Sequence, residues 1–177
     1  MGSSEPNFQL LDFYPELILI KEKFEEIKNE ATSVALNMMP INDHRIGKDE
    51  WFIFSLLPEI EDRPKVPTEM WMNNQLHAPV TTGAVGQLEN VHAFAFSRLR
   101  PGGYIRSHRH HNPYVTAIFC LEDGGESYIQ VEDEKRFFKN SEFIIFDYTK
   151  KHEVRNLGSE DRIVLLILID NMLLSPG

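Results

Sequence analysis

The sequence contains a single cysteine, so no disulfide can form within the chain. Cys120 lies in the apolar run TAIFCL, where burial explains a cysteine better than a role as a thiol nucleophile. Disulfides are common in secreted proteins and rare in reducing compartments. The chain therefore fits a reducing compartment, and we expect a cytoplasmic location.

Long apolar runs are also lacking. The longest, IVLLILI at 163–169, is bounded by Arg162 and Asp170 and is far shorter than the roughly 20 residues that a helix needs to cross a bilayer. The N-terminus shows no basic region followed by an apolar stretch, so no secretory signal is visible. These absences predict a soluble protein without a membrane span.

Positive charge is in deficit. The chain has 18 Lys and Arg against 27 Asp and Glu, which gives a formal net charge of −9 and argues against a nucleic-acid partner. Its 177 residues, 42% hydrophobic and 25% charged, are ordinary for a globular protein of one domain. We expect a single domain over residues 1–177.

The first half of the chain carries one helical pattern. Apolar residues recur at steps of three and four within 15–38, which predicts an amphipathic helix there: Leu17, Ile20, Phe24, Ile27, Ala31 and Val34. Residues 39–90 contain five prolines and three glycines among short apolar pieces such as WFIFSLL at 51–57. This composition predicts an irregular wrap with brief strands.

The second half reads as a series of strands. Five apolar runs, separated by turn sequences such as RPGG, EDGG and NLGSED, are VHAFAFSRL, YVTAIFCL, ESYIQVE, RFFKNSEFIIFD and RIVLLILID. The spacing leaves no room for crossover helices, so the strands must pair antiparallel. We predict a mainly β fold, a jelly-roll or cupin-like double-stranded β-helix over 91–170, with 8–90 as the outer helix and wrap.

Histidines with ligand spacing stand at the start of one of these runs. In an extended strand His108 and His110 project to the same side, about two residue rises apart, whereas His111 faces away. His152, which also precedes a strand, can supply a third imidazole, and neutral imidazole suits Fe, Zn, Cu and Ni. The alternative is a solvated histidine-rich loop beside a proline. We favour a metal site formed by His108, His152 and His110.

Arg162 opens the most apolar run of the chain, ten residues after His152. A guanidinium there can point into the barrel beside the metal and hold a carboxylate in bidentate fashion. The alternative is an arginine that reaches solvent and pairs with Asp161 or Glu160.

Two stretches resemble the aspartyl/asparaginyl β-hydroxylase family of Fe(II)/2-oxoglutarate-dependent oxygenases. SEFIIFDYTKKHEVRN, followed by Arg162, resembles that family's apolar run, turn, His-Glu-Val and arginine ten residues after the histidine. SRLRPGGYIRSH is similar to its Ser-x-x-x-Pro-Gly-x-x-x-x-x-His element. Looser similarity reaches back to KFEEIKNEA, EWFIFSL and TTG, in the family's order.

The resemblance implies roles for particular residues. His108 and His152 would bind Fe(II), Arg162 and Ser97 would hold 2-oxoglutarate, and Thr116 matches the position of an arginine that the family tends to carry as an anion contact. The implied reaction is the dioxygen-dependent hydroxylation of an unactivated C–H bond in an amino-acid, peptide or lipid substrate. Asp147 or Glu153 could orient an imidazole, with Asp147 as the cap of its own turn the alternative.

The chain departs from the family at His110, which stands where many oxygenases place a carboxylate ligand. An all-histidine site occurs in cupin dioxygenases that use no 2-oxoglutarate. A second hypothesis is therefore a three-histidine dioxygenase or a cupin-like metal-binding module without 2-oxoglutarate. In either case the 39–90 segment would select the substrate, and four large side chains there are candidates for the cavity mouth: Trp51, Met70, Trp71 and Met72.

Overall fold

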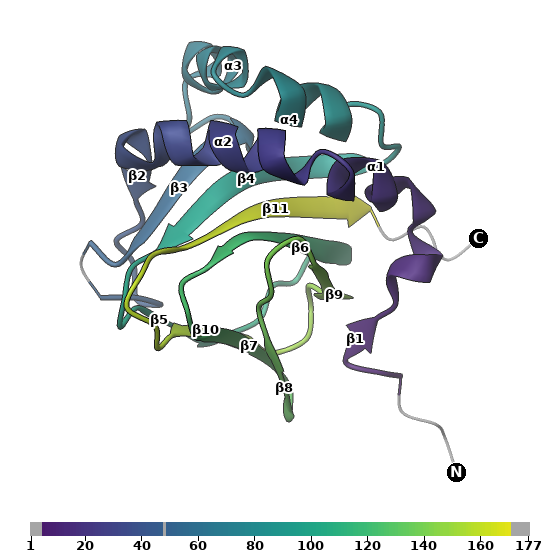
Figure 1. The fold of residues 1–177 in the computed structure, drawn as a ribbon, viewed down its shortest axis with the longest axis vertical. Helices are drawn as coiled ribbons and strands as arrows, with labels where there is room; N and C mark the ends of the chain where they lie inside the picture. The colour runs from purple at the N-terminus through teal and green to yellow at the C-terminus, as the bar shows by residue number, and fades with distance from the viewer. Residues whose placement is uncertain (1–4, 48, 171–177) are drawn as a thin grey trace.

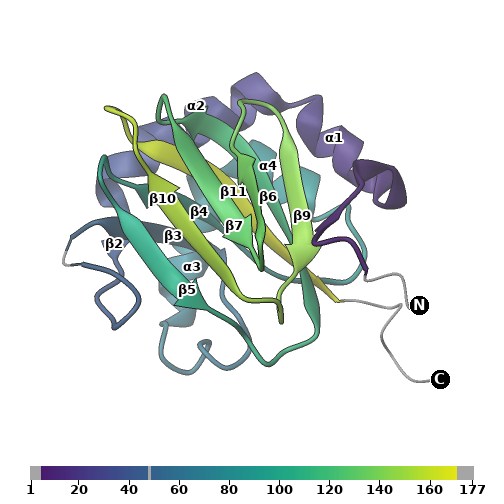
Figure 2. The same ribbon diagram turned by 90° about the horizontal axis from the view of Figure 1, so that it is seen from below.

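Two antiparallel sheets face each other in the structure, a computed structural model that describes residues 5–47 and 49–170 (Figures 1 and 2). Within these residues the larger sheet has the order β1-β9-β6-β11-β4-β3-β2. Its strands are β1 (Phe8–Gln9), β2 (Met39–Pro40), β3 (Trp51–Leu57), β4 (Val91–Leu99), β6 (Tyr114–Asp123), β9 (Phe143–Asp147) and β11 (Arg162–Asp170).

The smaller sheet, over the described part of the chain, has the order β5-β10-β7-β8. Its strands are β5 (Tyr104–His108), β7 (Ser127–Val131), β8 (Glu134–Phe137) and β10 (His152–Asn156). Every pairing in both sheets is antiparallel. The predicted mainly β, double-stranded β-helix is therefore confirmed.

The run RFFKNSEFIIFD, expected as one strand, is two strands in different sheets. β8 ends at Phe137 in the smaller sheet, and β9 begins at Phe143 in the larger one. The chain reverses between them at Ser141, whose φ of 66° is left-handed and unusual for a residue other than glycine. The sequence carries no glycine or proline there to mark the turn.

The predicted helix of 15–38 is helical but interrupted. After two short 3-10 turns, η1 (Leu11–Phe13) and η2 (Pro15–Leu17), the chain forms α1 (Ile18–Lys21), α2 (Phe24–Val34) and the 3-10 turn η3 (Ala35–Asn37). Lys23, between α1 and α2, leaves the helical conformation with φ −103° and ψ 23°. Ile20 on one side and Ile27 on the other are both fully buried, so the apolar period continues across the break and cannot reveal it.

The prediction of an irregular 39–90 segment with brief strands was incomplete, because two helices lie within it. They are α3 (Thr68–Leu76) and α4 (Pro79–Val85). Pro67 precedes α3 and Pro79 begins α4, and a proline is well tolerated at the start of a helix because its missing N–H would have no partner there. None of the helices in the described residues is both long and apolar enough to span a membrane.

The larger sheet is covered on both faces. Helices α1, α2 and α4 pack on its outer face, and the smaller sheet lies across its inner face (Figure 1). On β11, Ile163, Leu165 and Ile167 point to the helices, whereas Val164 points to the other sheet. A strand covered on both sides reads as a continuous apolar run, which explains IVLLILI.

Adjacent leucines of β11 provide a test of this two-faced arrangement. We expect Leu165→Ala, in the outer core at 0% exposure, to lower the free energy of unfolding by about 3 kcal/mol. Leu166→Ala should cost less, because Leu166 is only partly buried and lines a cavity. Urea unfolding of both variants measures the difference, and an equal or reversed cost would contradict the assignment of faces.

Candidate metal centre

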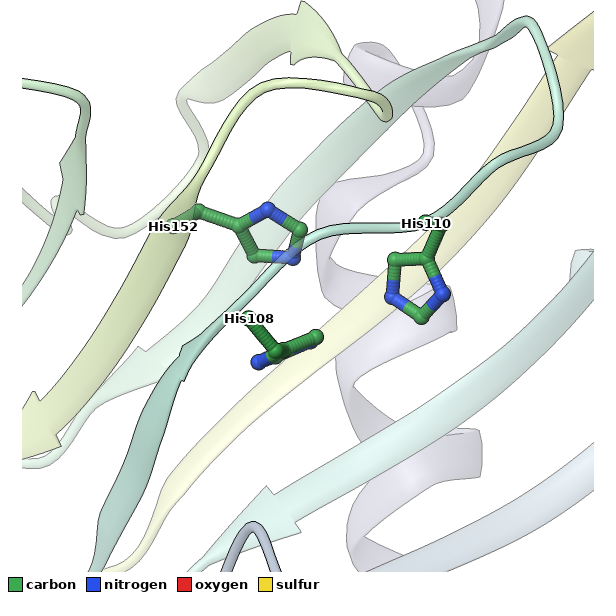
Figure 3. A group of neighbouring side chains, drawn as sticks. All are labelled: His108, His110 and His152. Atoms are coloured by element: carbon green, nitrogen blue, oxygen red, sulfur yellow. The ribbon is translucent and has the colours of Figure 1, made fainter.

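Three histidines meet between the two sheets (Figure 3). His108 ends β5, His152 begins β10 and is its partner in the strand ladder, and His110 lies two residues beyond β5. One ring nitrogen from each histidine lies within 4.8 Å of the others. Because a zinc-like ion binds imidazole nitrogen at about 2.0–2.1 Å, this group is close enough to share one ion after small adjustments of the side chains.

Backbone carbonyls orient two of the three rings. Nδ1 of His108 lies 2.7 Å from the carbonyl oxygen of Arg106, and Nδ1 of His152 lies 2.8 Å from that of Lys150. A carbonyl can only accept, so each Nδ1 carries the proton and donates it. Nε2 of both rings is then left with a free lone pair, the form that binds a metal.

The two carboxylates considered as orienting partners of His152 are engaged elsewhere. Asp147 accepts hydrogen bonds from the backbone N–H and the hydroxyl of Thr149, at 2.8 and 2.7 Å. Glu153 accepts one from the hydroxyl of Tyr104 at 2.6 Å. Asp147 therefore caps its own turn, which is the second of the two roles expected for it, and does not orient His152.

His110 is held by stacking. Its ring lies on that of Tyr148, with the centroids 3.7 Å apart and 7° between the planes, and its backbone N–H donates to the Tyr148 carbonyl at 3.3 Å. Tyr148 is fixed in turn by donating its hydroxyl proton to Oε1 of Glu59 at 2.8 Å. Tyr148 thus sets the orientation of His110, a role that no sequence pattern around Tyr148 indicates.

Burial keeps all three imidazoles neutral at physiological pH. Desolvation is the main cause that lowers the pKa of His108, of His110 to about 3 and of His152 to about 4. Repulsion from the neighbouring histidines and from Arg45 lowers the pKa of His110 further. Neutral imidazoles bind metal without first having to lose a proton.

The histidines open onto a cavity of about 670 Å³ that is lined by the inner faces of the two sheets and by the loops on either side of β3. This volume lies within the usual range for a small-molecule site. Apolar side chains form most of its wall, and all the candidate residues line it: Ser97, His108, His110, Thr116, His152 and Arg162.

Arg162 is 2% exposed, and no described carboxylate forms an ion pair with it. Asp161, the surface partner considered above, pairs instead with Arg98 at 3.1 Å. Burial lowers the pKa of Arg162 to about 10, so the guanidinium remains charged at neutral pH. Its Nε has no hydrogen-bond acceptor among the described residues. A buried cation in this state lacks the anion that normally accompanies it.

Ser97 connects Arg162 to Trp51. The Ser97 hydroxyl oxygen accepts a hydrogen bond from Nη2 of Arg162 at 3.2 Å and another from Nε1 of Trp51 at 2.9 Å. Since both lone pairs are used, the hydroxyl proton of Ser97 is left to donate. The guanidinium and this hydroxyl together present hydrogen-bond donors to the cavity.

Thr116 lies toward the other end of the cavity. It is the ladder partner of Leu168, six residues along β11 from Arg162, or roughly 20 Å at 3.3–3.4 Å per residue. Its other partner is Phe146, whose ring centroid lies 4.9 Å from that of His152. The Thr116 hydroxyl is buried without a hydrogen-bond partner among the described residues, on the histidine side of the cavity.

Of the four residues of 39–90 that were expected at the cavity mouth, one lines the cavity. Trp51 lines it, but Met70, Trp71 and Met72 are on α3 and do not. Arg45 and Glu59, from the same segment, do line it. They lie in the loops on either side of β3, where the sequence offers no pattern to distinguish a cavity residue from an exposed charge.

The fold and the three-histidine group together define a cupin-like barrel with a candidate metal site. The family model for aspartyl/asparaginyl β-hydroxylase matches residues 21–171. The chain belongs to this family. A comparison with curated protein sequences found no match.

Solved structures resemble this chain at low sequence identity. A predicted oxalate decarboxylase from Thermotoga maritima is 19% identical with a TM-score of 0.51, over 76% of this chain and 92% of that one, and this likeness concerns the fold alone. A cupin-2 domain protein from Rhodospirillum rubrum is 10% identical with a TM-score of 0.49, over 76% and 69%. A cupin domain of an XRE-family transcriptional regulator from Enterobacter cloacae is 14% identical with a TM-score of 0.47, over 70% and 99%.

The lowered histidine pKa values predict how metal-free protein responds to acid. Between pH 6.5 and about 4 the unfolded chain binds protons that the folded protein resists, so the free energy of unfolding should fall as the pH falls through this window. Urea unfolding at pH 7, 6 and 5 in the presence of a chelator measures it. The double variant His110→Gln, His152→Gln should show a flatter dependence, and equal slopes would contradict the prediction.

Proposed function

We propose that the protein is an Fe(II)- and 2-oxoglutarate-dependent oxygenase that hydroxylates an unactivated C–H bond of an amino-acid, peptide or lipid substrate. Dioxygen is the second substrate. No nucleic acid is involved, and the single buried cysteine supports a cytoplasmic location. The observation that carries the proposal is that Arg162, in the same cavity as the three histidines, is buried and has no carboxylate partner among the described residues.

The donor set fits the metal. His108 and His152 have their Nδ1 protons directed to backbone carbonyls, and His110 is neutral and within reach of the same point. Imidazole nitrogens suit Fe(II) among the first-row metals, and a three-ligand face leaves coordination positions open. We assign His108 and His152 as iron ligands and His110 as a third.

The far end of the cavity fits an anion. Within the described part of the chain, Arg162 has no ion-pair partner and no acceptor for its Nε, and Ser97, which accepts from its Nη2, has a hydroxyl proton left to donate. 2-Oxoglutarate carries a carboxylate at each end, and in the proposed complex one end binds the metal and the other pairs with Arg162. A carboxylate at Arg162 would neutralise the buried charge and form the bidentate pair that a guanidinium favours.

Iron(II) with 2-oxoglutarate supplies the oxidant that inserts one oxygen atom of dioxygen into the substrate C–H bond. The protein residues bind and orient. His108 and His152 are held in one tautomer, Arg162 and Ser97 fix the cosubstrate, and the apolar wall of the cavity limits the access of water. Thr116, with its unpaired hydroxyl, is assigned as a further polar contact, on the histidine side of the cavity.

The second candidate is a three-histidine dioxygenase or a cupin-like metal-binding module without 2-oxoglutarate. The position of His110 favours it, because this ring lies within the same group as the other two where many oxygenases have a carboxylate. The two candidates differ in what they expect of Arg162. Only the oxygenase needs an anion there.

Thermal unfolding of metal-free protein distinguishes them. We expect Mn(II) or Fe(II), added without oxygen, to raise the melting temperature, and 2-oxoglutarate to raise it again only when the metal is present. A ligand at 100 times its Kd stabilises the folded state by about 2.7 kcal/mol. A metal effect without a 2-oxoglutarate effect would support the second candidate, and no metal effect would contradict both.

Substitution of Arg162 tests the assignment of the anion site. Arg162→Leu should retain the melting-temperature increase caused by the metal and lose the increment caused by 2-oxoglutarate, because an apolar side chain can replace an unpaired buried charge without loss of the fold. Arg98→Leu is the matched control, since Arg98 has its own partner in Asp161. An undiminished response to 2-oxoglutarate in Arg162→Leu would contradict the assignment.

A further inference from the structure

The charged residues that line the cavity differ in whether the protein neutralises them. They are Arg45, Glu59, Asp62, Lys65 and Arg162. Arg45 is held by both carboxylate oxygens of Asp43, and Lys65 pairs with Asp62 at 3.1 Å. Arg162 and Glu59 remain without an ionic partner among the described residues.

Glu59 is half-buried and only partly satisfied. Its Oε1 accepts the hydroxyl proton of Tyr148 at 2.8 Å, while no described side chain donates to Oε2. Burial, together with the negative charges of Asp62 and Glu61, raises the pKa of the Glu59 carboxyl more than the Tyr148 hydrogen bond and the charge of His92 lower it. The surroundings therefore compensate a negative charge at this position only in part, and a cation beside it would be favoured.

The two unpaired charges lie at opposite ends of β3. Trp51, which shares Ser97 with Arg162, begins the strand, and Glu59 follows its last residue, Leu57, by two positions. A strand of this length spans roughly 20 Å. Arg162 and Glu59 are therefore too far apart to neutralise each other.

The surroundings of Glu59 connect it to the histidines. Tyr148, which donates to Glu59, is 8% exposed and stacks on His110. The carboxylate is thus fixed one tyrosine ring away from the candidate metal ligands. Thr116, 4% exposed and with an unpartnered hydroxyl, lines the cavity on the same histidine side and offers a second polar contact.

We propose that Glu59 binds a positively charged group of the substrate, an ammonium or a guanidinium, and so orients the substrate at the histidine end of the cavity. The substrate class that follows is a cationic amino acid or amine. This inference rests on the proposed function, because only that function makes the bound molecule a substrate. The binding of the cation itself does not require turnover.

The test uses Zn(II)-loaded protein, in which the metal cannot support oxidation of the ligand, and protein-observed NMR titrations with and without 2-oxoglutarate. The probes form pairs of similar shape that differ by one positive charge: lysine with Nε-acetyl-lysine, arginine with citrulline, and each of the four with its Nα-acetyl derivative. The first two comparisons report a side-chain cation, and the last reports an α-ammonium. We expect at least one cationic probe to bind and its neutralised counterpart to bind at least about tenfold more weakly, the order of a lost charge-assisted hydrogen bond.

Variants show whether Glu59 is responsible. Glu59→Gln, which can still accept the Tyr148 hydrogen bond, should weaken the cationic probe about tenfold and leave the neutral probe unchanged. Glu61→Gln removes the same charge from an exposed side chain of the same loop that does not line the cavity, and should change binding less than about twofold.

Three results would overturn the inference: no cationic probe binds, the neutralised probes bind equally well, or Glu59→Gln and Glu61→Gln behave alike. The effect of 2-oxoglutarate on the same spectra reports separately on the proposed function. If cation binding depends on Glu59 but 2-oxoglutarate does not change the spectra, the oxygenase proposal is contradicted and the cation site is supported.

Discussion

The free energy needed to desolvate one buried guanidinium is the constraint on which the interior of this protein depends. Arg162 begins a strand that is otherwise apolar, and desolvation of its charge is only partly offset by a hydrogen bond to Ser97 and by the face of Phe138, whose ring centroid is 5.1 Å from the Arg162 Cζ atom. A protein that needed only stability would favour an apolar residue there. The position makes chemical sense if an anion completes it, because Ser97, which accepts from both Arg162 and Trp51, has its hydroxyl proton left to donate beside the guanidinium.

The same constraint explains why the larger sheet is covered on both faces. The helices bury the outer face through residues such as Leu165 and Ile167, and this core needs nothing from the cavity. The inner face also packs an apolar cluster against the smaller sheet, through residues such as Val164 and Phe146. Part of this face is given to the cavity that Arg162, Ser97 and Thr116 line, so the candidate site lies on the inner face alone.

The sequence was most informative where a residue's type alone limits its use. The boundaries of β4 and β11 matched the predicted runs, and His108, His110 and His152 did come together in space. The sequence HRH places two imidazoles two residues apart, a spacing typical of metal ligands, although His110 lies beyond the end of β5 and not in the strand. The motif around His152 resembles that of the family. Whether each one binds metal stays a prediction.

Other features could not be predicted, for identifiable reasons. Prolines that suggested irregular structure instead begin α3 and α4, and the break at Lys23 leaves the apolar period intact. The orienting partners of His108 and His152 are backbone carbonyls, which have no sequence signature. Tyr148 and Glu59 act through a tertiary contact between residues 89 positions apart, which no local pattern encodes.

A crystal structure of the protein grown without oxygen, with Mn(II) and 2-oxoglutarate, tests the central claim most directly. The account predicts one ion on Nε2 of His108 and of His152, and a 2-oxoglutarate carboxylate within hydrogen-bond distance of both the Arg162 guanidinium and the Ser97 hydroxyl. An ion bound away from the histidines, or a 2-oxoglutarate that leaves Arg162 without a partner, would contradict it.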